Sequence, residues 1–315
     1  MRLEIKEQIF SLEERKTPSC HASTIVQLSG GHLLAAWFGG RHEGANDVEI
    51  WCAQRDEQGW SSPRQASPAS NLPCWNPVLY AEGERVTLWY KHGTPIPDWY
   101  TRTAESLDGG QTWVNDRELI PGDRTGGRGP VKNKPIRLKN GWLLAGASHE
   151  TLEGVWLPFT EFSQDGGKTW IRSAYLRSEP AAKLIQPTLW ESESGVHMLL
   201  RSGAGWIYKA DSTDQGLTWS AAAPICVPNN NSGLDCVRLP DGRIALVCNP
   251  ISDPGLRTPV SLLLSEDDGN HFHKVMDLED GEGEYSYPAV IWAGERLHIT
   301  FTYRREQIMY CRVQL

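Results

Sequence analysis

The stretch Ser106-Leu107-Asp108-Gly109-Gly110-Gln111-Thr112-Trp113 decides the fold of this 315-residue chain, because it recurs along the sequence. The further copies, of which the last ends in His-Phe instead of Thr-Trp, are Ser163–Trp170, Ser212–Trp219 and Ser265–Phe272. Ser and Asp side chains hydrogen-bond the amides of a tight turn, Gly adopts backbone conformations closed to other residues, and an aromatic ring packs beneath. The repeat therefore predicts one hairpin turn per unit, and it gives the repeated Asp residues a structural rather than a catalytic role.

The repeat has a regular period. Its closing aromatic residues, counted from Trp60 at the end of a shortened copy, lie 53, 57, 49 and 53 residues apart. Each unit also contains a strand, a turn and a second strand, and the six instances are residues 24–37, 78–89, 136–145, 188–200, 237–247 and 289–301. Six units that each suffice for a four-stranded antiparallel sheet predict an all-β, six-bladed β-propeller, with residues 1–315 as a single domain. The last unit is too short for four strands, so we expect residues 3–10 to complete it and close the ring.

Composition and charge exclude several classes of function. Lys and Arg number 31 against 39 Asp and Glu, for a formal net charge of −8, which argues against a nucleic-acid or anionic-membrane partner. The first residues lack the apolar segment of a signal peptide, and no later stretch is long enough to span a bilayer, so we expect a cytoplasmic protein. The seven cysteines have no Cys-x-x-Cys spacing and the nine histidines no His-Glu-x-x-His spacing. We therefore expect free, buried thiols, no metal and no cofactor.

Ligands bind to propellers at the axial mouth, where the entries to the innermost strands and the loops after the second strands meet. This sequence places many polar and basic residues at those positions, although the overall charge is negative. Guanidinium groups match planar oxyanions, so the pattern predicts a site for a carboxylate or a sulfate. The residues expected to bind substrate are Arg201, Arg257, Arg128, Lys132, Lys134, Gln186, Tyr287 and Asp235. Arg304 and Arg305 are further candidates.

The repeated turns, the six units and the spacing of the central residues together resemble the sialidase (neuraminidase) superfamily over nearly the whole chain. In that family the repeated turn is the Asp box, three arginines bind the substrate carboxylate, and a tyrosine paired with a glutamate is the nucleophile. By this resemblance Arg201, in Leu-Leu-Arg-Ser-Gly, matches the second arginine, and Arg257, in Arg-Thr-Pro-Val-Ser, matches the third. Tyr285, in Glu-Tyr-Ser-Tyr-Pro, has the spacing of the nucleophile.

The chain departs from the family pattern at two positions. His21 stands in place of the first arginine, and Gln186 stands in place of the glutamate that activates the tyrosine. The resemblance assigns the acid/base role to Asp47. Glu191 is the residue expected to replace the missing glutamate, with Glu150 and Glu284 as alternatives.

Three functions are consistent with these residues. The first is an exo-acting glycosidase of the sialidase type, in which Tyr285 attacks the anomeric carbon of a carboxylate-bearing sugar such as a sialoside. The second is a lyase that eliminates across a uronate, with His21 and Tyr285 as base and acid. The third is a carbohydrate-binding propeller without catalysis. All three predict an acidic oligosaccharide as the partner, and the sequence leaves the sugar, the linkage and the oligomeric state open.

Overall fold

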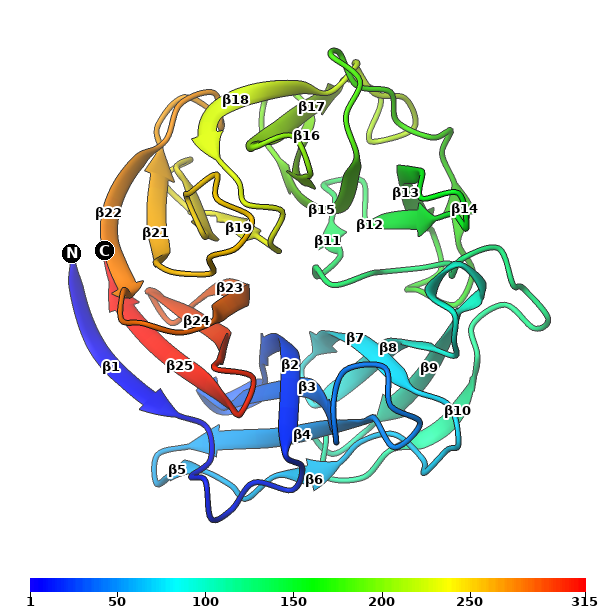
Figure 1. Ribbon diagram of the computed structural model, residues 1–315, viewed down its shortest axis with the longest axis vertical. Helices are drawn as coiled ribbons and strands as arrows, with labels where there is room; N and C mark the ends of the chain where they lie inside the picture. Colours follow the sequence, from blue (N-terminus) through cyan, green and yellow to red (C-terminus); the bar gives the residue numbers. More distant parts are fainter.

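Six antiparallel sheets, called blades 1 to 6 here, surround a central axis (Figure 1) in the computed structural model, which describes all 315 residues. From the axis outward, blade 1 contains β2 (Ser19–Gln27), β3 (Leu33–Gly40), β4 (Glu49–Asp56) and β5 (Gly59–Trp60), with β6 (Arg64–Gln65) also paired to β4. Blade 2 contains β7 (Cys74–Glu82), β8 (Arg85–His92), β9 (Tyr100–Ser106) and β10 (Val114–Glu118). Blade 3 contains β11 (Ile136–Arg137), β12 (Leu143–Glu150), β13 (Trp156–Ser163) and β14 (Ile171–Arg172).

The second half of the ring repeats this order. Blade 4 contains β15 (Leu184–Glu191), β16 (Val196–Ser202), β17 (Trp206–Ser212) and β18 (Ala223–Pro228). Blade 5 contains β19 (Asp235–Arg238), β20 (Ile244–Cys248), β21 (Val260–Ser265) and β22 (His273–Glu279). Blade 6 contains β23 (Tyr285–Ala293), β24 (Arg296–Tyr303), β25 (Gln307–Gln314) and, from the other end of the chain, β1 (Arg2–Gln8). The predicted all-β, six-bladed propeller and its closure by the N-terminal strand are confirmed.

Helical structure is limited to two single 3₁₀ turns, η1 (Ser29–Gly31) and η2 (Ile96–Asp98). No helix has the length and apolar character needed to cross a bilayer. All seven cysteines are free, and Cys226 alone among them is exposed.

The repeated turns have the hydrogen bonds that the sequence predicts. In the copy at residues 106–113, the Ser106 hydroxyl accepts from the Gly110 amide and donates to Asp108 Oδ1, both at 2.7 Å. Asp108 also accepts from the amide and the hydroxyl of Thr112, at 2.9 and 2.6 Å. These bonds, first among them the one from the Thr112 hydroxyl, lower the pKa of Asp108 to about 2. The Asp residues are therefore structural, as expected.

The same turns also join neighbouring blades. A Cβ atom on Gly110 would lie 2.7 Å from Leu34 of the preceding blade, and one on Gly269 would lie 2.7 Å from Trp190. The corresponding contacts of Gly167 and Gly216 are with Trp89 and Leu144, again in the blade before. Glycine is needed there for two reasons, because the backbone has positive φ and because the preceding blade leaves no room for a side chain.

We predict that Gly110→Ala destabilises the protein more than Gly141→Ala. The two glycines have nearly equal φ values, +86° and +89°, but a Cβ at position 141 meets nothing within 4 Å. The difference in unfolding free energy between the two variants therefore isolates the contact between blades, which we expect to be worth about 1–3 kcal/mol. Denaturant unfolding measures it, and equal stability of the two variants would contradict this role.

Candidate functional site

The inner strands are irregular near the end of the axis at which the chain enters them. The pairing between first and second strands shifts register between His21 and Thr24, Trp75 and Val78, Ile185 and Thr188, and Ser286 and Ala289. The residues with positive φ at or near the entries to the six inner strands are Ala22, Asn76, Lys132, Gln186, Asn231 and Tyr287. A bulge redirects side chains that would otherwise alternate between the faces of a sheet. The bulges therefore decide which residues face the axis.

Gln186 and Tyr287 both contact Arg201, which lies near the end of β16, the second strand of blade 4. Arg201 Nη1 donates to Tyr287 Oη at 2.5 Å and to Gln186 Oε1 at 3.2 Å. Its Nε donates to Asn231 Oδ1 at 2.9 Å, and the residue is 8% exposed. Nη2 has no hydrogen bond within the protein, so this group can still bind an acceptor from outside.

A second guanidinium lies over the same tyrosine. The Cζ atom of Arg257 is 5.7 Å from the centroid of the Tyr287 ring, and that of Arg201 is 5.6 Å away. Arg257 Nη1 contacts Glu284 Oε1 and the Ser286 hydroxyl, each at 3.3 Å. Its Nε and Nη2 are unpaired. The two arginines expected to hold a carboxylate therefore converge on one tyrosine, which is Tyr287.

His21 completes this cluster. Its ring centroid lies 4.2 Å from that of Tyr287, and the residue is 1% exposed. Neither ring nitrogen has a hydrogen-bond partner. Burial lowers the pKa of His21 well below its usual value, and the charges of Arg305, Arg257 and Arg201 lower it further. His21 is therefore a neutral imidazole with an unused donor and an unused acceptor.

Tyr285, the expected nucleophile, points elsewhere. It is fully buried among the apolar residues between blades 5 and 6, and its ring packs 5.0 Å from that of Tyr303. Its hydroxyl donates to the Glu282 carbonyl at 2.9 Å and contacts neither Arg201 nor Arg257. Of the two tyrosines of this short motif, the bulge thus brings Tyr287 and not Tyr285 to the arginines.

Two expected acid/base residues are also outside the cluster. Glu191 ends β15, five residues beyond Gln186, or roughly 17 Å along an extended strand, and it accepts a bond from the Lys139 amide. Asp47 is exposed and paired with Arg41 at 2.8 Å. Slight burial raises its pKa, but the bonds from the Arg41 amide and guanidinium outweigh this and leave it below the usual value. Neither carboxylate forms a hydrogen bond or ion pair with Arg201, Arg257 or Tyr287.

Glu150, one of the two alternatives to Glu191, is better placed. It ends β12 and has no hydrogen-bond partner for its carboxyl group. Burial raises its pKa, and the charge of Arg201 partly opposes that shift. Trp156, its partner across the strand pair, lies 5.9 Å from the Arg201 guanidinium. Glu150 is thus an unpaired carboxyl group that is close enough to Arg201 to be affected by its charge.

Several expected ligand-binding residues instead hold the blades together. Lys132 Nζ donates to the Leu234 carbonyl and Asn133 Oδ1, both at 2.9 Å, and to the Pro288 carbonyl, which ties blade 3 to blades 5 and 6. Lys134 pairs with Asp235 at 2.8 Å.

Two further members of the expected set have similar roles. Asp235 also accepts from Thr188 at 2.7 Å and from the Val290 amide at 2.9 Å. Arg128 pairs with the fully buried Glu161 of blade 3. These four basic and acidic side chains therefore all have protein partners in the structure.

A network around Arg305 was only partly visible in the sequence. Arg305 Nε donates to Glu284 Oε1 at 2.9 Å, and Nη1 pairs with Glu43. Arg305 was one of two candidates in the sequence, whereas Glu43 lies in the loop from which only Asp47 was predicted to act. No local motif marks Glu43, because its partner is 262 residues away.

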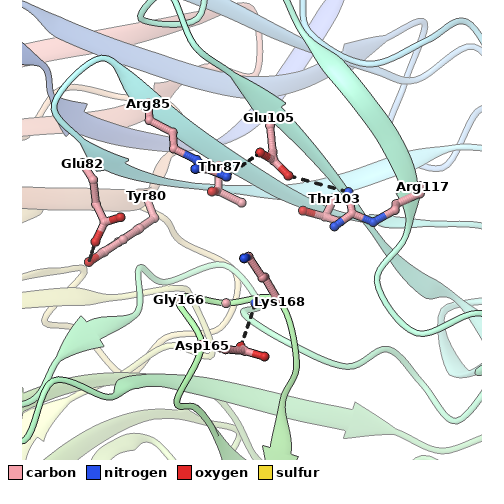
Figure 2. Close-up of a pocket in the computed structure, with 11 residues that line it drawn as sticks. Tyr80, Glu82, Arg85, Thr87, Thr103, Glu105, Arg117, Asp165, Gly166 and Lys168 are labelled. Carbon is pink, nitrogen blue, oxygen red and sulfur yellow. Dashed lines mark hydrogen bonds and ion pairs between the residues drawn. The ribbon is translucent and has the colours of Figure 1, made fainter.

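A separate polar pocket of about 200 Å³ lies at the opposite end of the propeller (Figure 2). It is lined by the hairpin of β7 and β8, which carries Glu82 and Arg85, and by the repeated turn at Asp165–Lys168. Arg85 and Glu105, on the neighbouring strands β8 and β9, pair at 2.8 Å on one side of it. The pocket is remote from Arg201 and Tyr287. Glu82 lies at one end of β7, whereas Trp75 and Asn76 lie at the other end, where the chain enters the blade at the mouth.

Comparison with known proteins identifies the family. A model described as the BNR repeat-like domain matches residues 31–299. The chain belongs to the BNR repeat-like family. No curated protein sequence matches it significantly.

Solved structures share the fold of this BNR repeat-like protein at low identity. The Hadza microbial sialidase Hz136 matches with a TM-score of 0.80 and 14% identity, over 99% of this chain and 68% of that one. A protein of unknown function from Dyadobacter fermentans matches with a TM-score of 0.77 and 14% identity, over 100% and 99%. Trypanosoma rangeli sialidase in complex with the inhibitor DANA matches with a TM-score of 0.72 and 16% identity, over 95% of this chain and 55% of its own. The chain therefore spans about half of the Trypanosoma enzyme, and the likeness establishes a sialidase-like fold.

We predict that His21 makes the protein less stable in acid. The unfolded chain binds a proton on this residue near the usual value of 6.5, whereas the folded protein does not. The stability should therefore fall as the pH drops below 6.5, by up to about 1.4 kcal/mol per pH unit for this group. Replacing His21 with Phe keeps an aromatic ring against Tyr287 and should flatten the pH dependence. Parallel curves of unfolding free energy against pH for the two proteins would refute the prediction.

Proposed function

We propose that this protein is a glycoside hydrolase that acts on a carboxylate-bearing sugar at the axial mouth, with Tyr287 as its nucleophile. The observation that carries the proposal is the placement of two guanidiniums, those of Arg201 and Arg257, over one tyrosine ring. The sialidase-like fold and the family membership are consistent with it.

Binding of the sugar's acid group would use the unpaired donors of the arginines. Arg201 Nη2 and the Nε and Nη2 groups of Arg257 have no protein acceptor. Charge-assisted bonds from guanidinium to carboxylate are among the stronger polar interactions in proteins. Replacing Arg201 with Ala should therefore weaken binding by roughly 2–5 kcal/mol if the pair is buried.

Tyr287 would attack the anomeric carbon. Arg201 Nη1 donates to the Tyr287 hydroxyl and so fixes the position of the attacking oxygen. The bond from Tyr287 oxygen to the sugar forms as the glycosidic bond breaks, the tyrosine proton passes to solvent, and Glu150 gives its proton to the leaving oxygen. Water next attacks the same carbon and gives a proton to Glu150, and the displaced Tyr287 oxygen takes back a proton from solvent. A carboxyl group with a raised pKa suits this role better than Asp47 does.

Elimination is the second candidate, and the position of His21 beside Tyr287 supports it. The unpaired imidazole would accept the carbon-bound proton next to a uronate carboxylate, but its lowered pKa makes it a weaker base than an ordinary histidine. The two arginines would stabilise the negative charge that develops, a carbon–carbon double bond would form, and Tyr287 would give its proton to the departing oxygen. Arg201, Arg257 and Tyr287 would take part in either reaction.

Product analysis separates these functions. The protein is incubated with a panel of sialosides and uronate-capped oligosaccharides, and the products are weighed by mass spectrometry. Hydrolysis adds the mass of one water to the summed products. Elimination adds none and creates an unsaturated sugar that absorbs ultraviolet light. Binding without any product would support the non-catalytic alternative and overturn the enzyme proposal.

Replacing Tyr287 with Phe should reduce turnover by roughly 10²–10⁴-fold, because either reaction loses its reacting hydroxyl. Tyr285→Phe is the matched control, since it removes a hydroxyl two residues away that bonds only the Glu282 carbonyl and Arg304. We expect that control to turn over substrate at nearly the normal rate. Full activity of Tyr287→Phe, or loss of activity in Tyr285→Phe alone, would return the role to Tyr285.

An acidic oligosaccharide is the partner that this proposal requires. Small imported oligosaccharides would suit the cytoplasmic location that we propose from the sequence, and cell fractionation tests that location.

A further inference from the structure

We infer that Asn231 is a positioning residue for Arg201, and that its uncharged amide leaves the full positive charge of that arginine to the acid group of a ligand. The inference rests on the proposed function and adds a residue that sets how strongly Arg201 binds an anion. Asn231 acts through Arg201 and is not itself a substrate contact.

Asn231 lies in a short polar segment between two blades. Residues 229–232, Asn-Asn-Asn-Ser, come after β18 of blade 4 and before β19 of blade 5. Asn231 is half-buried and the other three residues are buried. The φ angle of Asn231 is +61°, a conformation that glycine adopts freely and that Asn and Asp tolerate better than other residues. Substitutions among these three residue types therefore change the side chain without straining the backbone.

Hydrogen bonds from the neighbours of Asn231 fix this segment to the loops that carry both substrate-binding arginines. Asn229 Oδ1 accepts from the Ser202 amide at 3.2 Å, and Asn230 Nδ2 donates to the Leu256 carbonyl. Ser202 directly follows one of the two arginines, and Leu256 directly precedes the other. The segment thus joins the two places in the chain from which guanidinium groups reach the mouth.

A further pair of hydrogen bonds extends this network to blade 6. The Ser232 hydroxyl donates to Asn249 Oδ1 at 2.9 Å, and Asn249 Nδ2 donates to the Tyr285 carbonyl at 2.8 Å. Tyr285 begins the strand whose bulge brings Tyr287 to the arginines. The segment that carries Asn231 is therefore hydrogen-bonded to parts of blades 4, 5 and 6.

Arg201 is held by uncharged acceptors. Its Nε donates to Asn231 Oδ1 at 2.9 Å, and its Nη1 donates to Gln186 Oε1 at 3.2 Å and to a tyrosine hydroxyl. It forms no ion pair, whereas Arg257 pairs with Glu284 at 3.3 Å. The protein therefore orients the Arg201 guanidinium without neutralising it.

This arrangement favours binding of an anion at the free Nη2 group. Arg201 is 8% exposed, and a charge so far removed from water is unfavourable until a counter-ion binds. Burial raises the pKa of Glu150, which forms no bond with Arg201 and so does not supply that counter-ion. A carboxylate in place of the Asn231 amide would do so, and it would compete with the acid group of a ligand.

The test measures binding of N-acetylneuraminic acid, glucuronic acid and their methyl esters by calorimetry. Asn231→Asp keeps the shape of the side chain and places a carboxylate on Arg201 Nε. It should weaken binding of the acids by roughly 10-fold or more and change binding of the esters by less than about 2-fold. Asn231→Gly removes the acceptor without adding charge. It should weaken binding of the acids by roughly 2- to 10-fold, because Arg201 must then be ordered when the ligand binds.

The order of these two variants distinguishes the inferred role from a purely structural one. If Asn231 only packed the loop, the Asp variant, which has the same shape, would bind the acids normally and the Gly variant would bind them worst. Asn115→Asp is the matched control, because Asn115 also has positive φ, +57°, and lies on β10, the outermost strand of blade 2. It adds the same charge to the protein and should change neither affinity.

Thermal unfolding of each variant shows whether the fold is kept. If Asn231→Asp does not fold, Asn231→Gly decides alone, and full affinity of that variant for the acids would overturn the inference.

The outcomes also separate this inference from the proposed function. If Arg201→Ala abolishes binding of the acids while both Asn231 variants bind as the unmodified protein does, the inference is wrong and the proposed function survives. If Asn231→Asp binds the acids more tightly than Asn231→Gly does, Asn231 has a structural role only and the inference is wrong. If the unmodified protein binds neither acid, both the inference and the acidic-sugar function fail.

Discussion

Close contact between one blade and the next is the constraint on which this structure depends. The glycine at the fifth position of each Asp box leaves no space between its backbone and a large apolar side chain of the preceding blade. That contact recurs at the four junctions from blade 1 to blade 5, and β1 completes blade 6 and closes the ring. Closure in turn brings the entries of six inner strands to one end of the axis. Residues that are hundreds of positions apart in the sequence thereby become neighbours.

The chemistry of the mouth depends on a local concentration of positive charge in an acidic protein. Arg201, Arg257 and Arg305 belong to blades 4, 5 and 6 and lie at strand ends or in loops at the mouth. Few carboxylates lie beside them. Other basic residues near the axis are already paired within the protein: Lys132 donates to backbone carbonyls, and Lys134 pairs with a carboxylate. The arginines that we propose to bind substrate are therefore recognised by their unpaired N–H groups, not by their distance from the axis.

The sequence was sufficient for the fold because turn chemistry is local. Ser106, Asp108 and Gly110 interact within five residues, so their spacing alone predicts a turn, and the period of that turn predicts the number of blades. The site was predicted less well, because strand alternation fails at the bulges. Tyr285 and Tyr287 would lie on one face of a regular strand, yet only Tyr287 meets Arg201. Glu43 could not be predicted, since nothing near it in sequence indicates Arg305 as its partner.

The way the ring closes also has a consequence for folding. Strand β1 pairs with β25, with Arg2 opposite Gln314. Blade 6 is therefore complete only when these two segments, far apart in the sequence, have paired. Pairings of such sequence separation are slow to form, because a long loop must close before they contribute stability. The junction between blades 6 and 1 is also where Arg305 meets Cys20 and Glu43, beside His21. A chain that has not closed its ring therefore lacks the junction at which Arg305 meets Cys20 and Glu43.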